Sequence, residues 1–168
     1  DALISDGCVL ISQHADTTGA PTACEAAGVP CVGYNISMIA TAPDQALTSA
    51  SNNWGIYMTY AVQSVLDGTE IPADWCKGFS DGAVLITELN DKAVAPGTKE
   101  KVEEVEAKLA SGELHVFDTS TFTVDGKELT TYKKDGSDTE YISDGYFHES
   151  EYGSAPAFDV AIDGITSI

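Results

Sequence analysis

The sequence predicts an α/β domain with a mainly parallel sheet flanked by helices, and three observations support this fold class. Apolar runs at 8–13 and 82–89 show little polar alternation, which is typical of strands covered on both faces. Helix-forming segments separate such runs, as in consecutive βαβ units. The length of 168 residues also suits a single domain that can bury a hydrophobic core.

The expected elements follow one another closely. In order, they are the end of a helix at 1–7, a strand at 8–13, a helix at 20–27, a strand at 30–34, a loop at 36–46, a short strand at 47–50, a helix at 54–67, a strand at 82–89 and a helix at 98–111. The first helix would be only one turn long before its glycine stop at Gly7. We therefore expect one lobe of a larger α/β protein.

The expected helices have recognisable start and stop signals. Asp16 and Thr17 occupy the N-cap region of the helix at 20–27, and Thr98 occupies that of the helix at 98–111. Left-handed glycines commonly end helices. Such a glycine follows each of the three full helices, at Gly28, Gly68 and Gly112.

The helix at 54–67 has the clearest amphipathic pattern in the chain. Its apolar residues recur at spacings of three and four, so they form one stripe on the helix surface. The stripe consists of Trp54, Met58, Ala61, Val62, Val65 and Leu66. The helix at 98–111 has a narrower stripe among charged residues, which is typical of a surface helix.

The character of the sequence changes after residue 114. We divide the domain into an α/β ligand-binding lobe at 1–117 and a hairpin-rich and turn-rich extension at 118–168, whose last part crosses the hinge. Asp125 and Gly126 predict a two-residue hairpin turn, because both residues tolerate a positive φ. The acidic segment at 133–145 lacks the ligand spacing of an EF-hand, so we expect no calcium site there.

Composition excludes several partners. The formal net charge is −19 and the chain contains no arginine, so neither nucleic acid nor an anionic membrane surface is an expected partner. No apolar run is long enough to span a membrane, and no targeting signal is visible. The four cysteines lack the spacing of a metal site and are interpreted as buried small hydrophobes, with a disulfide left open for an oxidising compartment.

Ligands bind parallel sheets at the carboxyl ends of the strands, which here points to the loops at 13–18, 35–38 and 49–54. In the first loop, Asp16 could contact a ligand or serve only as an N-cap. His14 could act as a base, although a structural polar role is more common for such a histidine. Asn35 in the second loop could bond a sugar hydroxyl or the edge of a base, or simply form a turn.

The third loop contains two amides followed by an aromatic residue. Asn52 and Asn53 could read the edge of a planar ligand on which Trp54 stacks, although Trp54 also lies on the apolar stripe of its helix. No nucleophile with a base and an orienting group is evident, so we predict no catalytic residue, no metal and no cofactor. The alternative enzymatic reading is a small-molecule hydrolase or transferase that uses His14 and Asp16 as acid and base.

Five segments together resemble the C-terminal half of the BMP (basic membrane protein, PnrA-like) family of substrate-binding lipoproteins of ABC importers. They are QHADTTG (13–19), GVPCVGYN (28–35), ALTSASNNWGIYMTYAVQSVLDGT (46–69), ASGELHVF (110–117) and SAPAFDVAIDGI (154–165). The likeness covers nearly the whole chain in the right order, except around 118–148.

This resemblance implies the C-terminal lobe of a type I periplasmic-binding-protein fold, in which two lobes close around a ligand. The implied ligand is a purine nucleoside or purine base, with riboflavin or another flat heterocycle as the alternative. The implied partners are the ABC permease subunits and a missing N-terminal lobe. The implied location is extracytoplasmic, at the cell surface or in the periplasm, with a lipid anchor in an N-terminal segment outside this chain.

Two positions depart from the family pattern. Asn35 stands where an aspartate commonly bonds the ribose, and Asn52 stands where nucleoside binders often have lysine, whereas Trp54 matches the second tryptophan of a Trp-x-Trp subgroup. An amide is a weaker acceptor than a carboxylate, so these two departures favour a free base or another flat heterocycle as the ligand rather than a nucleoside. A further alternative is the effector-sensing lobe of a regulator with the same fold.

Overall fold

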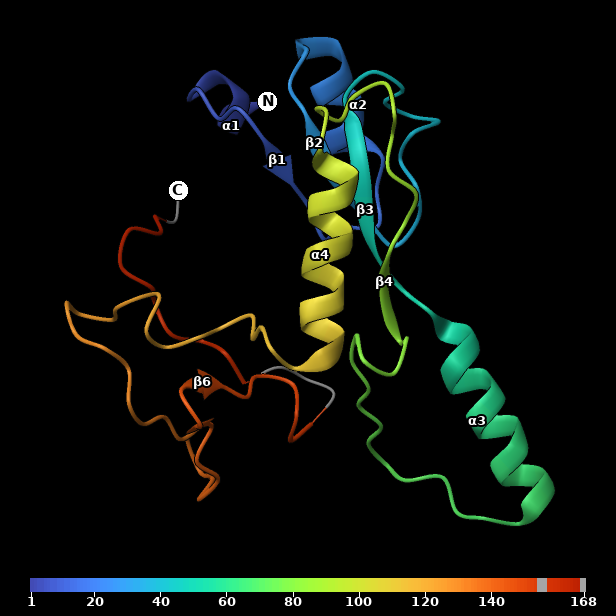
Figure 1. Ribbon diagram of the computed structural model, residues 1–168, viewed down its shortest axis with the longest axis vertical. Helices are drawn as coiled ribbons and strands as arrows, with labels where there is room; N and C mark the ends of the chain where they lie inside the picture. Colours follow the sequence, from blue (N-terminus) through green and yellow to red (C-terminus); the bar gives the residue numbers. More distant parts are fainter. Residues whose placement is uncertain (154–156, 167–168) are drawn as a thin grey trace.

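The computed structural model describes residues 1–153 and 157–166 (Figure 1). Its elements are α1 (Ala2–Ser5), β1 (Ile11–Ser12), α2 (Gly19–Ala27), β2 (Cys31–Tyr34), β3 (Ala46–Asn52), α3 (Trp54–Asp67), β4 (Val84–Ile86), α4 (Thr98–Ser111), β5 (Ile142–Ser143) and β6 (Tyr146–Phe147). The expected order of helices and strands is confirmed up to α4. Residues 154–156 of the last family-like segment lie outside the described residues.

The main sheet has four strands in the order β1-β2-β3-β4. β1, β2 and β3 are parallel, as predicted, but β4 runs antiparallel to β3, with Ala50 opposite Ile86. The expectation of a long strand at 82–89 is wrong in length, because β4 covers only Val84–Ile86. A parallel return would require a crossover that packs back across the sheet. Instead, α3 extends away from the sheet, so the chain re-enters it from the end where β3 stops (Figure 1).

The helix ends agree with the glycine signals but not with the expected N-caps. Gly28, Gly68 and Gly112 all adopt the left-handed conformation at the C-terminal ends of α2, α3 and α4. The N-cap of α2 is Thr18 and that of α4 is Gly97, so Asp16, Thr17 and Thr98 are not N-caps. The Asp16 carboxylate instead accepts a hydrogen bond from the Asn35 side chain, just after β2.

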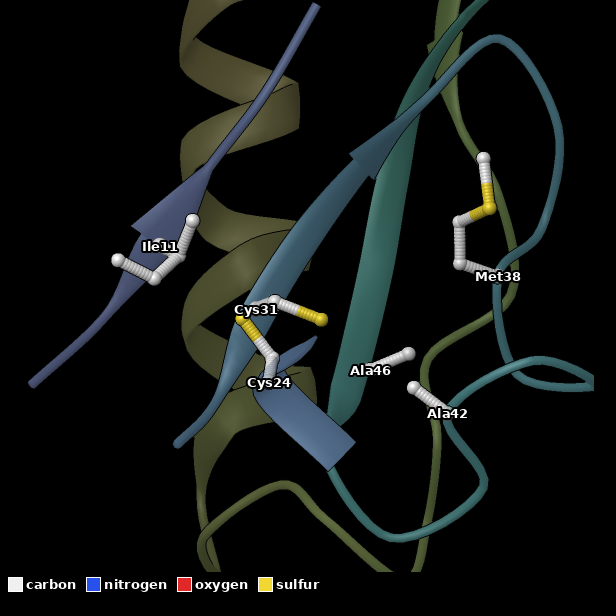
Figure 2. Close-up of a cluster of buried hydrophobic side chains, with 6 residues drawn as sticks. All are labelled: Ile11, Cys24, Cys31, Met38, Ala42 and Ala46. Carbon is white, nitrogen blue, oxygen red and sulfur yellow. The ribbon is translucent and has the colours of Figure 1, made fainter. Parts of the chain in front are cut away.

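A small hydrophobic core lies between α2 and the sheet. Its buried members are Ile11, Cys24, Cys31, Met38, Ala42 and Ala46. Figure 2 shows Cys24 of α2 beside Cys31 of β2, with the methyl groups of Ala42 and Ala46 close to each other. The four cysteines are free thiols, and burial raises the pKa of Cys31 to about 11, so this thiol stays protonated. Small residues let α2 and the strands approach closely.

The apolar stripe of α3 is the largest departure from the expected packing. Val62, Val65 and Leu66 are 60%, 71% and 75% exposed, and Trp54 is 59% exposed. Residues of this face form a shallow apolar hollow of about 290 Å³ with Ile71. The amphipathic pattern correctly predicts the helix, but the described residues of the chain do not cover the stripe.

The C-terminal extension has a hydrophobic cluster of its own around Phe147, which is completely buried. Aromatic rings surround it, and their centroids lie between 4.8 and 6.0 Å from that of Phe147. These rings belong to Tyr132, Tyr141 and Phe158. The predicted turn at Asp125 and Gly126 is confirmed, since Val124 and Lys127 exchange backbone hydrogen bonds of 2.8 and 3.1 Å across it.

Glu140 ties the acidic loop of this extension together. Its carboxylate accepts hydrogen bonds from the Thr131 hydroxyl at 2.6 Å and from the backbone N–H groups of Tyr132 and Ile142 at 2.7 and 3.0 Å. Both carboxylate oxygens of Glu140 therefore have hydrogen-bond donors within the loop. In the part of the chain that the structure describes, no group of three or more His, Cys, Asp or Glu side chains is placed to hold a metal ion.

Acidification should selectively weaken this loop. The Thr131, Tyr132 and Ile142 hydrogen bonds lower the pKa of Glu140 from 4.5 to about 2. Because the folded-state pKa lies below the unfolded-state value, the contribution to stability is present above about pH 5 and disappears as the pH falls through about 2. In acid titrations followed by circular dichroism, Glu140→Gln should therefore be less stable than the parent at neutral pH, and the gap should narrow toward pH 2. A gap that is independent of pH would contradict this account.

Candidate functional site

A wide groove of about 1180 Å³ opens at the carboxyl ends of β2 and β3. The start of α3 and the segment 73–84 form one side of it. The end of α4, the following residues up to Val116 and residues 146–151 of the C-terminal extension form the other side. The groove thus lies at the carboxyl edge of the sheet, where parallel sheets bind ligands. It is large enough for a nucleoside-sized molecule.

Three of the six predicted site residues line this groove: Asn52, Asn53 and Trp54. β3 ends at Asn52, and α3 starts at Trp54, so the strand-to-helix junction places all three at the mouth. The Asn52 amide donates a hydrogen bond of 3.4 Å to the Tyr34 hydroxyl, which also lines the groove. Trp54 does not pack into a core here, so its ring remains available to a ligand.

Asp16 and Asn35 meet at the neighbouring strand ends, outside the lining of the groove. The Asn35 side-chain amide donates to Asp16 Oδ1 at 3.1 Å, and the Ser51 hydroxyl donates to the Asn35 carbonyl at 2.6 Å. Asn35 adopts a positive φ of 68°, a conformation that asparagine tolerates better than most residues. The structure therefore joins Asp16, Asn35 and the end of β3 into one polar edge.

His14 is not brought to this edge by any contact among the described residues. Its side chain is exposed, and it has no hydrogen bond to Asp16. The Asp16 carboxylate instead accepts the hydrogen bond from the Asn35 side chain. The geometry therefore does not support the pairing of His14 and Asp16 as acid and base.

Sequence reasoning missed the aromatic residues on the α3 side of the groove. Trp75 lies edge-on to Tyr57 with a centroid distance of 5.2 Å and stacks on Tyr60 at 6.2 Å. Trp75 and Tyr57 both line the groove. Residues 71–83 form no helix or strand, so hydrophobic periodicity could not place Trp75. An isolated tryptophan in a polar loop was the only available signal.

The opposite side of the groove comes from the C-terminal extension. The rings of His115 and Tyr146 stack with centroids 3.5 Å apart. The Cys76 thiol donates to the Ser150 carbonyl at 2.6 Å, so the extension and the segment 73–84 are in direct contact. Lys77 pairs with Asp81 at 3.1 Å, and this hydrogen bond lowers the pKa of Asp81. Burial raises the pKa of the Glu149 carboxyl, which belongs to the C-terminal extension and also lines the groove. The groove thus combines aromatic rings with mostly acidic polar groups.

Comparison with known families identifies the chain. The sequence profile of the family described as ABC transporter substrate-binding protein PnrA-like matches residues 1–119. The chain belongs to the PnrA-like family of ABC transporter substrate-binding proteins. The matched segment contains β1 to β4, α4 and five groove-lining positions from Tyr34 to Tyr57. The resemblance found in the sequence is therefore confirmed over residues 1–119, and the family-like segment at 154–165 lies beyond the match.

Two curated relatives and one solved structure agree with this PnrA-like assignment. A purine-binding protein of Brucella abortus is 34% identical over 127 residues, which are 76% of this chain and 36% of that protein. A putative ABC transporter glucose-binding protein of Haloferax volcanii is 30% identical over 130 residues, 77% of this chain and 33% of that protein. The chain thus spans about a third of the curated relatives it matches.

The structural neighbour is an ABC transporter solute-binding protein from Conexibacter woesei. It superposes with a TM-score of 0.52 at 20% identity and covers 68% of this chain and 39% of its own. At this identity the match shows the fold alone. It agrees with a partial lobe of a periplasmic-binding-protein fold. No helix among the described residues of this PnrA-like chain is both long and apolar enough to cross a membrane.

One further polar constellation in the PnrA-like chain resembles a catalytic triad. The Ser143 hydroxyl lies 2.8 Å from His148 Nε2, and His148 Nδ1 lies 2.6 Å from a Glu151 carboxylate oxygen. Ser143 does not line the groove, however, and His148 is only 5% exposed. Ser143 belongs to β5 and His148 directly follows β6, so these contacts stabilise the β5–β6 hairpin next to the buried Phe147.

Proposed function

We propose that this chain is part of an extracytoplasmic solute-binding protein that delivers a purine base or nucleoside to an ABC permease. The observation that carries this proposal is the position of Asn52, Asn53 and Trp54 in an aromatic groove at the carboxyl edge of the sheet. Aromatic faces stack on planar heterocycles, and side-chain amides both donate to and accept from their edges. The name of the Brucella abortus relative supports the purine class.

We further propose that a second lobe completes the site in the intact protein. The exposed residues Val62, Val65 and Leu66 of α3 and the hollow that they line suit a packing surface, since a contiguous exposed apolar face is uncommon on a monomeric protein. The coverage of about a third of the curated relatives leaves room for such a lobe. Closure of the two lobes would then bury the ligand. Attachment to the membrane through a lipidated N-terminal segment belongs to the same proposal.

The proposal is tested by calorimetric titration of the intact protein with adenine, guanine, guanosine, inosine, riboflavin and glucose. Saturable binding of a purine is expected. Trp54→Ala should weaken it by about 10- to 100-fold, because stacking of a base on an aromatic ring contributes roughly 1–3 kcal/mol. Val9→Ala, at a residue that is 83% exposed, serves as a control and should bind normally.

Two outcomes would contradict the proposal. Saturable binding of glucose or riboflavin, together with no binding of any purine, would show that the ligand belongs to a different chemical class. Unchanged purine affinity in Trp54→Ala would place the ligand away from the groove mouth. The isolated chain of residues 1–168 should bind every compound of the panel weakly, since one lobe contacts only one face of a ligand.

A further inference from the structure

Glu149 is a half-buried carboxylate in the wall of the groove that the C-terminal extension provides. Other acidic groups of the groove have partners. Asp81 pairs with Lys77, and Glu151 accepts from the Tyr146 hydroxyl at 3.1 Å and contacts His148 at 2.6 Å. Among the described residues, the hydrogen bond recorded for the Glu149 carboxylate is to its own backbone N–H. Within residues 1–153 and 157–166, most of its acceptor capacity is therefore unused.

The backbone around Glu149 is held firmly. Phe147 is completely buried in the aromatic cluster, and the His148 ring is fixed between Ser143 and Glu151. The backbone N–H of Ala157 also donates to the Glu149 carbonyl at 2.9 Å. The side chain of Glu149 is thus presented to the groove from a rigid position. Positioning of this kind favours geometric discrimination between ligands.

A half-buried carboxylate with unused acceptors is costly to desolvate unless a ligand supplies donors. Burial accordingly raises the pKa of Glu149. Its own backbone N–H, His148 and His115 act in the opposite direction, whereas Glu151 adds to the effect of burial.

The two oxygens of one carboxylate match two parallel N–H groups, which gives a bidentate and charge-assisted pair. Guanine presents such a pair at N1–H and its 2-amino group, whereas hypoxanthine has N1–H alone and adenine lacks N1–H.

We propose that Glu149 reads the polar edge of the bound heterocycle and makes the site selective for a ring with two adjacent N–H donors, of which guanine is the purine example. This inference rests on the proposed function, because it assumes a purine in the groove. It also assigns a role to the C-terminal extension, which lies mostly beyond the residues 1–119 matched by the family profile. The extension adds Glu149 to a groove that Trp54 and Trp75 also line.

The test compares the intact protein with its Glu149→Gln variant by calorimetric titration. Guanine and hypoxanthine differ only in the 2-amino group, and guanosine and inosine form the matching nucleoside pair. The intact protein should prefer the 2-amino member of each pair. Glu149→Gln replaces one acceptor by a donor, so it should weaken guanine binding by about 10- to 100-fold and bring the two affinities of each pair together.

Two controls make the result decisive. Glu128→Gln removes an exposed carboxylate of the same extension and should leave the preference intact. Adenine should bind the Glu149→Gln variant about as well as it binds the parent, which verifies that the variant is folded. Purine binding without a 2-amino preference, or a preference that survives in Glu149→Gln, would overturn the role of Glu149 alone. If no purine binds the intact protein, the proposed function fails and this inference fails with it.

Discussion

Replacing Phe147 with alanine is expected to lower the free energy of unfolding of the C-terminal extension by about 3–5 kcal/mol, the usual cost of truncating a buried phenylalanine. Phe147 is completely buried, and the rings of Tyr132, Tyr141 and Phe158 surround it. The alanine variant would leave a cavity that these rings cannot fill without moving. Urea unfolding followed by the near-ultraviolet circular dichroism of the tyrosines should report the loss.

Tryptophan fluorescence provides an independent probe in the same experiment, because Trp54 and Trp75 both lie outside the extension at 118–168. Phe147→Leu retains most of the buried volume and should cost less than the alanine variant. An alanine variant as stable as the parent would show that the aromatic cluster does not hold the extension together.

Placing any side chain at Gly33 is expected to be the most damaging change in the sheet. A Cβ atom there would overlap Ser49 Oγ and would lie 2.5 Å from Met38 Cγ. Ser49 and Met38 are both buried, so neither can move into solvent. Overpacking of this kind costs about 1–3 kcal/mol. Gly33→Ala should therefore lower the midpoint of urea unfolding, and Gly33→Val should lower it further.

Gly78→Ala is the matched control for Gly33→Ala. Apart from its chain neighbours, no atom of the described residues lies within 4 Å of a Cβ at Gly78, so this variant should unfold at nearly the same urea concentration as the parent. If Gly33→Ala behaved like Gly78→Ala, β2 and β3 would not be as closely packed as the structure describes.

The local signals in the sequence predicted the elements more successfully than their packing. Glycines and amphipathic spacing placed the C-terminal ends of α2, α3 and α4 correctly. The direction of β4 and the exposure of the α3 stripe depend instead on where α3 points after β3. A stripe pattern is the same whether the partner surface belongs to this chain or to another segment, so periodicity could not reveal this.

In the candidate site, too, local sequence patterns predict some residues, whereas long-range contacts determine the position of others. The strand-to-helix junction is visible in the sequence and predicts Asn52, Asn53 and Trp54 at one edge of the sheet, and all three line the groove. Trp75 and Glu149 come from segments without regular periodicity, and long-range contacts bring them to the groove. The Cys76–Ser150 hydrogen bond, which joins residues 74 positions apart, is one such contact. No local sequence pattern predicts that the segments around Cys76 and Ser150 come into contact.

The measurement that tests the central claim most directly is a crystal structure of the intact protein with its tightest-binding purine. The account predicts a planar ligand at the carboxyl edge of the sheet, in contact with Trp54 and with at least one of Asn52 and Asn53. A purine bound with Trp54 and both asparagines outside contact distance would contradict the assignment of this groove as the ligand site.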